Sequence, residues 1–171
     1  MTSNREDNIC KENVFNELFR TFSKDLHDFL YYKFGAENNP KDLVQEAFLK
    51  LWNNCHKVPL EKARSFLFTV ANNQMLNELS KKKTVLNYAR EKPKSHTSES
   101  PEYVMEENEY MSKLQAAIES LSEEQRVTFL LNRVEGKKHQ EIAEMLGISR
   151  KAVEKRIYAA LDKLRKQVGD I

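Results

Sequence analysis

"HQEIAEMLGISRKAVEKRI", residues 139–157, decides how the C-terminal part of the chain folds. Two short helices that cross at a steep angle need a small residue at their contact, a turn residue that tolerates a positive φ, and apolar residues facing inward. Ala143, Gly147 and Val153 meet these needs in that order, and Ser149 stands where it can cap the second helix. The apolar side is completed by Ile142, Leu146, Ile148 and Ile157. The stretch therefore predicts a helix-turn-helix.

The outer face of the predicted second helix carries basic and polar side chains. Lysine and arginine can pair with phosphate or guanine, and glutamate can accept a hydrogen bond from the amino group of cytosine. The candidate DNA-binding residues are Ser149, Arg150, Lys151, Glu154, Lys155, Arg156 and Tyr158. The same pattern also fits two ordinary helices with a solvated, charged face. The spacing of the small and apolar residues, together with the local excess of basic ones, favours DNA binding.

Charge is unevenly distributed along the chain, although the formal net charge is only +2. Residues 137–166 contain nine Lys or Arg against four Asp or Glu, whereas residues 99–124 contain eight acidic residues and one lysine. The low net charge argues against a protein that coats nucleic acid through bulk electrostatics. We hypothesise instead that the acidic stretch screens the basic C-terminal helix in the free protein.

The composition indicates an all-α protein. With 171 residues, 40% of them hydrophobic, the chain can bury one core or two small ones. Four glycines and four prolines supply few of the turn signals that a many-stranded sheet requires. The sequence shows neither a signal-peptide pattern nor an apolar run long enough to cross a bilayer, so we expect a cytoplasmic protein.

The two cysteines, Cys10 and Cys55, lie far apart in the sequence and lack the CxxC spacing of a metal site. They do not resemble the disulfide framework of a small secreted protein. We therefore expect two reduced thiols, no metal ion and no cofactor.

Hydrophobic periodicity predicts three helices in the N-terminal part. The first, within residues 14–34, has an apolar stripe made of Phe15, Leu18, Phe19, Phe22, Leu26, Phe29 and Leu30. The second begins at Asn39-Pro40, where Asn can cap and Pro suits the first helical position. Its inward residues are Leu43, Ala47, Phe48 and Leu51. Residues 53–62 are predicted as a loop and residues 63–83 as the third helix.

A change of composition divides the chain into two modules. Residues 84–108 are polar, rich in Ser and Lys and interrupted by two prolines, so we predict a flexible linker there. The first domain is then residues 1–83 and the second residues 109–171. The second begins with a helix over residues 110–121, and Ser122 and Gln125 have the spacing of a capping box for the next helix, which ends at Gly136.

Three segments in this order resemble the sigma-70 family of bacterial transcription initiation factors, in its short extracytoplasmic-function (ECF) form. They are "DLVQEAFLKLW" at residues 42–52, "SFLFTVANNQMLNEL" at residues 65–79, and the stretch from residue 121 through the helix-turn-helix to residue 166. The resemblance covers residues 15–166. It implies a non-enzymatic sigma factor that binds core RNA polymerase and directs promoter-specific initiation.

The resemblance also implies roles for particular residues. Region 2, the N-terminal module, would bind the polymerase clamp through Asp42, Gln45, Glu46 and Lys50. It would engage the minus-10 element through Asn72, Asn73, Asn77, Lys81, Lys82 and Lys83, and hold a flipped base in the loop of residues 53–62. Region 4 would read the minus-35 element with the helix-turn-helix. Expected partners are core RNA polymerase, promoter DNA and an anti-sigma factor.

Three other classes compete with this interpretation. A free-standing helix-turn-helix regulator would bind duplex DNA without polymerase. An enzyme is disfavoured, because the four histidines His27, His56, His96 and His139 are scattered and no nucleophile or phosphate-binding motif accompanies them. A helical anti-sigma partner would not need the basic second helix of the helix-turn-helix.

Overall fold

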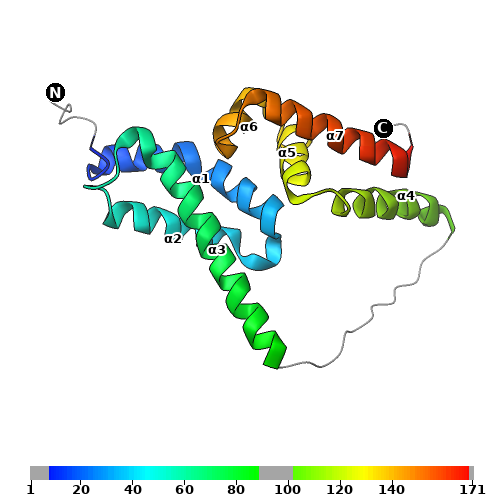
Figure 1. The fold of residues 1–171 in the computed structure, drawn as a ribbon, viewed down its shortest axis with the longest axis horizontal. Helices are drawn as coiled ribbons and strands as arrows, with labels where there is room; N and C mark the ends of the chain where they lie inside the picture. Colours follow the sequence, from blue (N-terminus) through cyan, green and yellow to red (C-terminus); the bar gives the residue numbers. More distant parts are fainter. Residues whose placement is uncertain (1–7, 89–101, 170–171) are drawn as a thin grey trace. The chain divides into compact units, whose positions relative to one another are not determined.

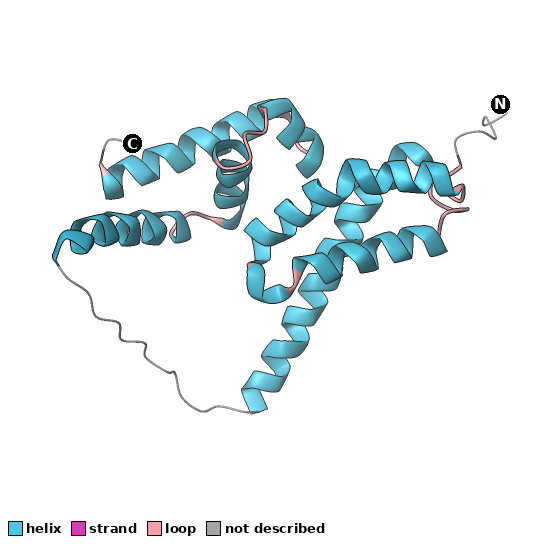
Figure 2. Cartoon of the chain, turned by 180° about the vertical axis from the view of Figure 1, so that it is seen from behind, coloured by secondary structure: helices cyan, strands magenta, loops and turns pink. Residues whose placement is uncertain are grey.

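The computed structural model describes the backbone of residues 8–88 and 102–169, and the side chains of residues 8–81 and 109–169. Within these ranges the chain is helical and contains no strand, which confirms the all-α prediction (Figure 2). The α-helices are α1 (Glu12–Phe34), α2 (Pro40–Asn53), α3 (Ala63–Tyr88), α4 (Glu102–Glu119), α5 (Glu123–Arg133), α6 (His139–Leu146) and α7 (Arg150–Val168). Short 3-10 turns, η1 (Ala36–Asn38) and η2 (Leu60–Lys62), precede α2 and α3.

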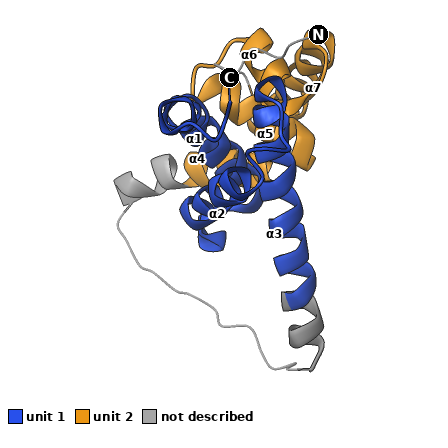
Figure 3. Cartoon of the chain, turned by 90° about the vertical axis from the view of Figure 1, so that its left-hand side faces the viewer, with its two compact units in different colours: residues 1–88 blue, residues 89–171 orange. Residues whose placement is uncertain are grey.

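The chain divides into two compact units, Met1–Tyr88 and Ala89–Ile171 (Figure 3). In the first unit α2 packs against both α1 and α3 (Figure 1). All the predicted inward residues of α2 are buried, namely Leu43, Ala47, Phe48 and Leu51. Leu26 and Leu30 of α1 and Leu67 of α3 are fully buried as well, on helices that pack against α2. The predicted periodicity therefore identifies the packed faces of this unit, with Phe19 of α1 as an exception at 42% exposed.

The start of α2 differs in detail from the prediction. Pro40 is the first helical residue, as predicted, but the Asn39 side chain makes no capping hydrogen bond. Asn39 instead adopts the left-handed conformation, with φ 48°, and its backbone carbonyl accepts from the N–H groups of Asp42 and Leu43. Asparagine tolerates this conformation better than most residues. Its contribution to α2 is thus made by its backbone.

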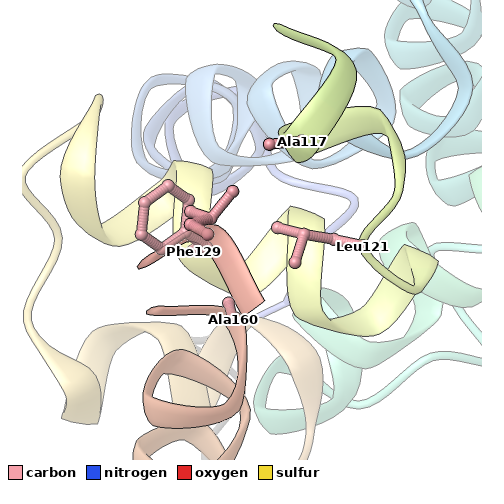
Figure 4. Close-up of a cluster of buried hydrophobic side chains, with 5 residues drawn as sticks. Ala117, Leu121, Phe129 and Ala160 are labelled. Atoms are coloured by element: carbon pink, nitrogen blue, oxygen red, sulfur yellow. The ribbon is translucent and has the colours of Figure 1, made fainter. Parts of the chain in front are cut away.

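The second unit is built around α7, which packs against α4, α5 and α6. One apolar cluster joins Ala117, Leu121, Phe129, Ala160 and Leu164, and the first four are labelled in Figure 4. The predicted capping box is confirmed: Ser122 Oγ accepts from the Gln125 N–H, and Gln125 Oε1 accepts from the Ser122 N–H. This cluster therefore joins α4, α5 and α7, while α6 packs against α5 and α7 at the helix-turn-helix.

Helix extends into both ends of the segment that we predict as a linker. Helix α3 continues to Tyr88 and α4 begins at Glu102, so residues 84–88 and 102–108 are helical. Leucine, glutamate and methionine in these stretches favour helix, and the prediction did not account for that preference. The rest of the predicted linker, residues 89–101, lies outside the described residues. None of the described helices is both long and apolar enough to cross a membrane.

The prediction of two reduced thiols is wrong, because Cys10 and Cys55 form a disulfide. Their Cα atoms are 5.1 Å apart, within the range that a disulfide spans. Helices α1 and α2 bring them together: Phe15, near the start of α1, contacts Trp52, near the end of α2, at 5.0 Å between ring centroids. A separation of 45 residues along the sequence gave no sign of this proximity.

Candidate nucleic-acid interface

The helix-turn-helix of the second unit has the geometry that residues 139–157 predict. Ala143 on α6 and Val153 on α7 are buried at the contact of the two helices. Gly147 ends α6 with φ 65°, and the Ile148 N–H donates to the Ala143 carbonyl at 3.0 Å. No atom lies within 4 Å of the position that a β-carbon on Gly147 would take. Glycine is therefore favoured here by its backbone conformation and not by lack of space.

Ser149 caps α7, because its Oγ accepts from the Ala152 N–H at 3.2 Å. The first two turns of the helix then present side chains to solvent. Arg150, Lys151, Lys155 and Tyr158 are exposed, and Tyr158 is 69% exposed. A capped helix start with cationic and aromatic side chains around it suits both phosphates and base edges.

Glu154 and Arg156, two of the predicted DNA-binding residues, have partners within the second unit. Glu154 accepts from Arg150 Nε at 3.0 Å, and His139 Nδ1 lies 3.6 Å from the same carboxylate. Arg156 Nη2 lies 2.8 Å from Glu124 on α5, and the Arg156 side chain is only 25% exposed. The Glu124 contact also joins the acidic stretch to the basic helix. Glu154 and Arg156 are therefore less available than Lys151 and Lys155, which are exposed.

In the first unit, a polar stripe runs along α3. Its members lie four residues apart on one helix face and are all exposed: Ser65, Thr69, Asn73, Asn77 and Lys81. The prediction contained the last three but missed Ser65 and Thr69. A repeat of hydrogen-bonding residues at four-residue steps was the signal that could have found them. We call these five residues the α3 stripe.

The other predicted minus-10 residues differ from the α3 stripe. Asn72 is half-buried, and its Oδ1 is buried without a hydrogen-bond partner. The side chains of Lys82 and Lys83 lie outside the described residues, although their backbone continues α3. The loop of residues 53–62 leads into α3 through η2, and the disulfide joins it to the turn before α1.

An apolar groove lies between α1 and α2. It has a volume of about 410 Å³ and is lined by Glu12, Phe15, Phe19, Gln45, Phe48, Leu49 and Trp52. Leu49 is 59% exposed and Trp52 40% exposed. Exposed apolar side chains gathered in one groove are uncommon on a protein surface away from interaction sites. We call it the α1–α2 groove.

The four predicted polymerase-binding residues are all exposed on α2, but they do not share one direction. Gln45 lines the α1–α2 groove. Lys50 instead donates to Gln74 Oε1 on α3 at 2.9 Å. The prediction counted Phe19 as core and did not include Leu49, so neither is among the predicted polymerase-binding residues. Asp42 and Glu46 remain polar neighbours on the same helix.

Comparison with known proteins matches both units to parts of one family. Residues 18–85 match the model of sigma-70 region 2, and residues 111–164 match the model of sigma-70 region 4. The two matches together cover more than half of the chain and lie one in each unit.

Individual relatives agree with these matches. The ECF RNA polymerase sigma factor SigX of Bacillus subtilis is 24% identical over 164 residues, which span 92% of this chain and 84% of SigX. The ferric citrate uptake sigma factor FecI of Escherichia coli is 26% identical over 152 residues, spanning 87% of each chain. The sigma factor RpoE from Bartonella quintana, solved in complex with the anti-sigma factor NepR, shares the fold. Its TM-score is 0.55 at 18% identity, over 90% of this chain and 96% of that one. The chain therefore belongs to the sigma-70 family as an ECF sigma factor, a protein that directs transcription initiation.

Proposed function

We propose that three surfaces of this sigma factor divide the work of initiation. The exposed face of α7 reads the minus-35 element, the α3 stripe with the loop of residues 53–62 engages the melted minus-10 element, and the α1–α2 groove receives the clamp of RNA polymerase. The chain itself catalyses no reaction and acts in the cytoplasm, where the polymerase works. The domains correspond to the two units, with region 2 in the first and region 4 in the second.

The observation that carries the minus-35 assignment is the exposed start of α7. Arg150, Lys151 and Lys155 surround a helix N-terminus whose cap, Ser149, is in place. Lysine and arginine at such a position can contact phosphates and the guanine edge in the major groove. Tyr158, one further turn along, adds an exposed aromatic ring.

The minus-10 assignment is supported by the chemistry of the α3 stripe. Melted DNA is held by cationic groups along its backbone and by pockets for unstacked bases. The amides of Asn73 and Asn77 can bond to base edges, and Lys81 at the end of the described stripe can bond to phosphate. Because lysine is a point charge without the planar fork of arginine, we assign Lys81, Lys82 and Lys83 to the DNA backbone.

The polymerase assignment is supported by the α1–α2 groove. Its floor is aromatic, with Phe19 and Phe48 at 4.9 Å between ring centroids, and polar residues of α2 stand beside it. An apolar centre with a polar rim is the usual composition of a protein interface. We assign the greater part of the affinity for polymerase to the apolar centre. We assign the specificity to the polar residues Asp42, Gln45, Glu46 and Lys50.

An anti-sigma factor is the remaining proposed partner. The solved Bartonella sigma factor of similar fold binds one. The α1–α2 groove suits such a partner as well as the polymerase, because three of its apolar residues stay 40% exposed or more in the free chain. Competition for one surface would keep the factor inactive until the partner is removed.

The test is co-elution of the purified chain with sigma-free core polymerase of its own bacterium, followed by sequencing of the transcripts that the complex initiates. A one-to-one complex that starts transcripts downstream of a shared pair of promoter elements is the expected result. If no complex forms and the chain instead shifts duplex DNA as a dimer, it is a free-standing regulator. A helical partner of another sigma factor would bind neither polymerase nor DNA.

A further inference from the structure

The disulfide joins two segments that border the proposed functional surfaces of the first unit. Cys10 lies in the turn just before α1, where its N–H donates to Asn8 Oδ1. Cys55 lies in the turn just after α2, where its N–H donates to the Trp52 carbonyl at 3.1 Å. Ile9, directly before Cys10, is 1% exposed, so the N-terminal turn is anchored in the core as well.

The immediate neighbours of the disulfide belong to the α1–α2 groove and to the loop of residues 53–62. Glu12 and Phe15 follow Cys10 on the first turns of α1, and Trp52 precedes Cys55; all three line the groove. Cys55 itself is part of the loop of residues 53–62. One covalent bond therefore holds the end of the groove and the start of the loop together.

The chemistry at the disulfide is that of an exchange site. Cys55 is buried at 8% exposed, whereas Cys10 is half-buried and is the more accessible residue of the pair. His56 is exposed and lies beside the disulfide. One of its ring nitrogens and the two cysteine sulfurs all lie within 4.8 Å of one another. A basic nitrogen beside a thiol can accept its proton and so favours the thiolate, which is the form that exchanges.

We propose that Cys10 and Cys55 are a reversible thiol–disulfide pair whose co-substrate is a small or protein-borne dithiol, and whose oxidised form orders the groove end and the loop. The pair is out of place as a permanent staple, because a protein that works beside RNA polymerase meets a reducing compartment. This inference rests on the proposed function for its consequence, although the exchange itself does not.

The reaction transfers two electrons and two protons. One thiolate of the dithiol attacks the Cys10 sulfur, a mixed disulfide forms, and the Cys55 sulfur leaves as a thiolate that takes a proton, with His56 as the nearby proton carrier. The second thiol of the dithiol then attacks the mixed disulfide. It releases Cys10 as a thiol and leaves the reagent as a cyclic disulfide. Oxidation by the disulfide form of the reagent follows the same steps in reverse.

The test equilibrates the intact chain with defined ratios of reduced and oxidised dithiothreitol, traps free thiols by alkylation and counts them by mass. Trp52 is the single tryptophan of the chain and lies next to the disulfide, so its emission reports the local structure independently of polymerase. Hydrogen exchange of residues 53–62 gives a second local readout. We expect the number of free thiols to change in one two-electron transition. The Trp52 emission should change over the same range of dithiothreitol ratios, and the loop should exchange hydrogen faster in the reduced form.

Variants separate the exchange chemistry from general effects on folding. Cys10→Ser should resemble the reduced chain in emission and loop exchange at every dithiothreitol ratio. His56→Gln should slow reduction, whereas the matched variant His27→Gln, on α1, should leave the rate unchanged. If Cys10→Ser does not fold, the reduced wild-type chain still provides the comparison.

Core polymerase then tests the consequence. The oxidised chain should bind core about threefold more tightly or better, the effect of one side chain that no longer has to be ordered on binding. A disulfide that resists excess dithiothreitol in the folded chain would overturn the proposal, as would reduced cysteines that hold Zn²⁺ with His56. Equal core affinity of the two forms would overturn the claim of control. If neither form binds core, the proposed function fails. The thiol count and the Trp52 emission still show whether Cys10 and Cys55 exchange reversibly with the dithiol.

Discussion

The guanidinium of Arg156 lies 2.8 Å from the carboxylate of Glu124, and this contact turns a predicted DNA-binding residue of α7 toward α5. The two residues are 32 positions apart in the numbering and belong to different helices of the second unit. Arg156 is 25% exposed, whereas Glu124 is 67% exposed. We therefore expect Arg156 to brace α7 against α5, with a smaller direct role in reading DNA than Lys151 or Lys155.

The brace is tested by a double-mutant cycle of Arg156→Ala and Glu124→Ala. A partly exposed ion pair of this kind contributes about 0.2–1 kcal/mol, so the coupling in the free energy of unfolding should fall in that range. Arg156→Ala should weaken minus-35 binding less than Lys151→Ala does. A larger loss for Arg156→Ala, with no coupling to Glu124, would return Arg156 to the DNA-reading set.

Replacement of Lys151 and Lys155 by Ala tests the exposed face of α7. Each lysine that contacts a phosphate should lower the slope of log affinity against log salt by about 1 when it is removed. Affinity for all sequences would fall together, because phosphate contacts carry no sequence information. The matched control is Lys163→Ala, an exposed lysine further along α7, which should leave the slope unchanged. The measurement is promoter binding by the holoenzyme across a salt series.

Asn73→Ala and Asn77→Ala should impair promoter opening more than promoter binding. If their amides bond to unstacked bases, each loss should cost about 0.5–1.5 kcal/mol of open-complex stability, the net contribution of a typical hydrogen bond. Permanganate reactivity of thymines in the melted region measures opening, while a mobility shift measures binding. Asn13→Ala removes an exposed amide from α1 and serves as the control. Equal effects of all three variants would remove the α3 stripe from the minus-10 contact.

Leu49 tests the α1–α2 groove, because it is 59% exposed and contributes little to the core. Leu49→Ala should weaken binding to core polymerase by about 1–2 kcal/mol while the melting temperature stays nearly constant. Leu76→Ala, which truncates a 48% exposed leucine of α3 outside the groove, is the matched control. Unchanged core affinity for Leu49→Ala would show that core polymerase binds another surface of the first unit.

Gly147→Ala should lower the free energy of unfolding of the second unit by about 1–2 kcal/mol, because alanine is strained at φ 65°. Gly147→Asn should lower it less, since asparagine tolerates the left-handed conformation. Thermal unfolding followed by circular dichroism measures both variants. An alanine variant as stable as the wild type would show that the turn relaxes to another conformation.

Local sequence accounts for the elements whose hydrogen bonds stay within a few residues. The left-handed turn at Gly147, the cap at Ser149 and the capping box of Ser122 and Gln125 are each formed by groups at most five residues apart. The inward face of α2 is equally local, because a helical period alone decides which side chains share a face. These features were predicted correctly for that reason.

The exposure of Phe19 could not be predicted in the same way. The period of α1 places it on the apolar stripe, but whether that part of the stripe is covered depends on how far α2 and α3 reach along it. Partner choice has the same origin: Lys50 bonds to Gln74 on α3, and Arg156 to Glu124 on α5. Each contact requires two helices to pack at a particular position along their axes.

The sequence by itself determined the main body of each helix, the caps at Ser122 and Ser149, the helix-turn-helix and the family, because these depend on residue types and spacings along one segment. Only the tertiary structure decided that Cys10 meets Cys55, that Phe19 and Leu49 share an open groove, and that Arg156 turns toward α5. The physical reason is the distance along the sequence over which the interacting groups are separated. A hydrogen bond within a helical turn is defined by local geometry, whereas contacts between helices depend on the packing of the whole unit.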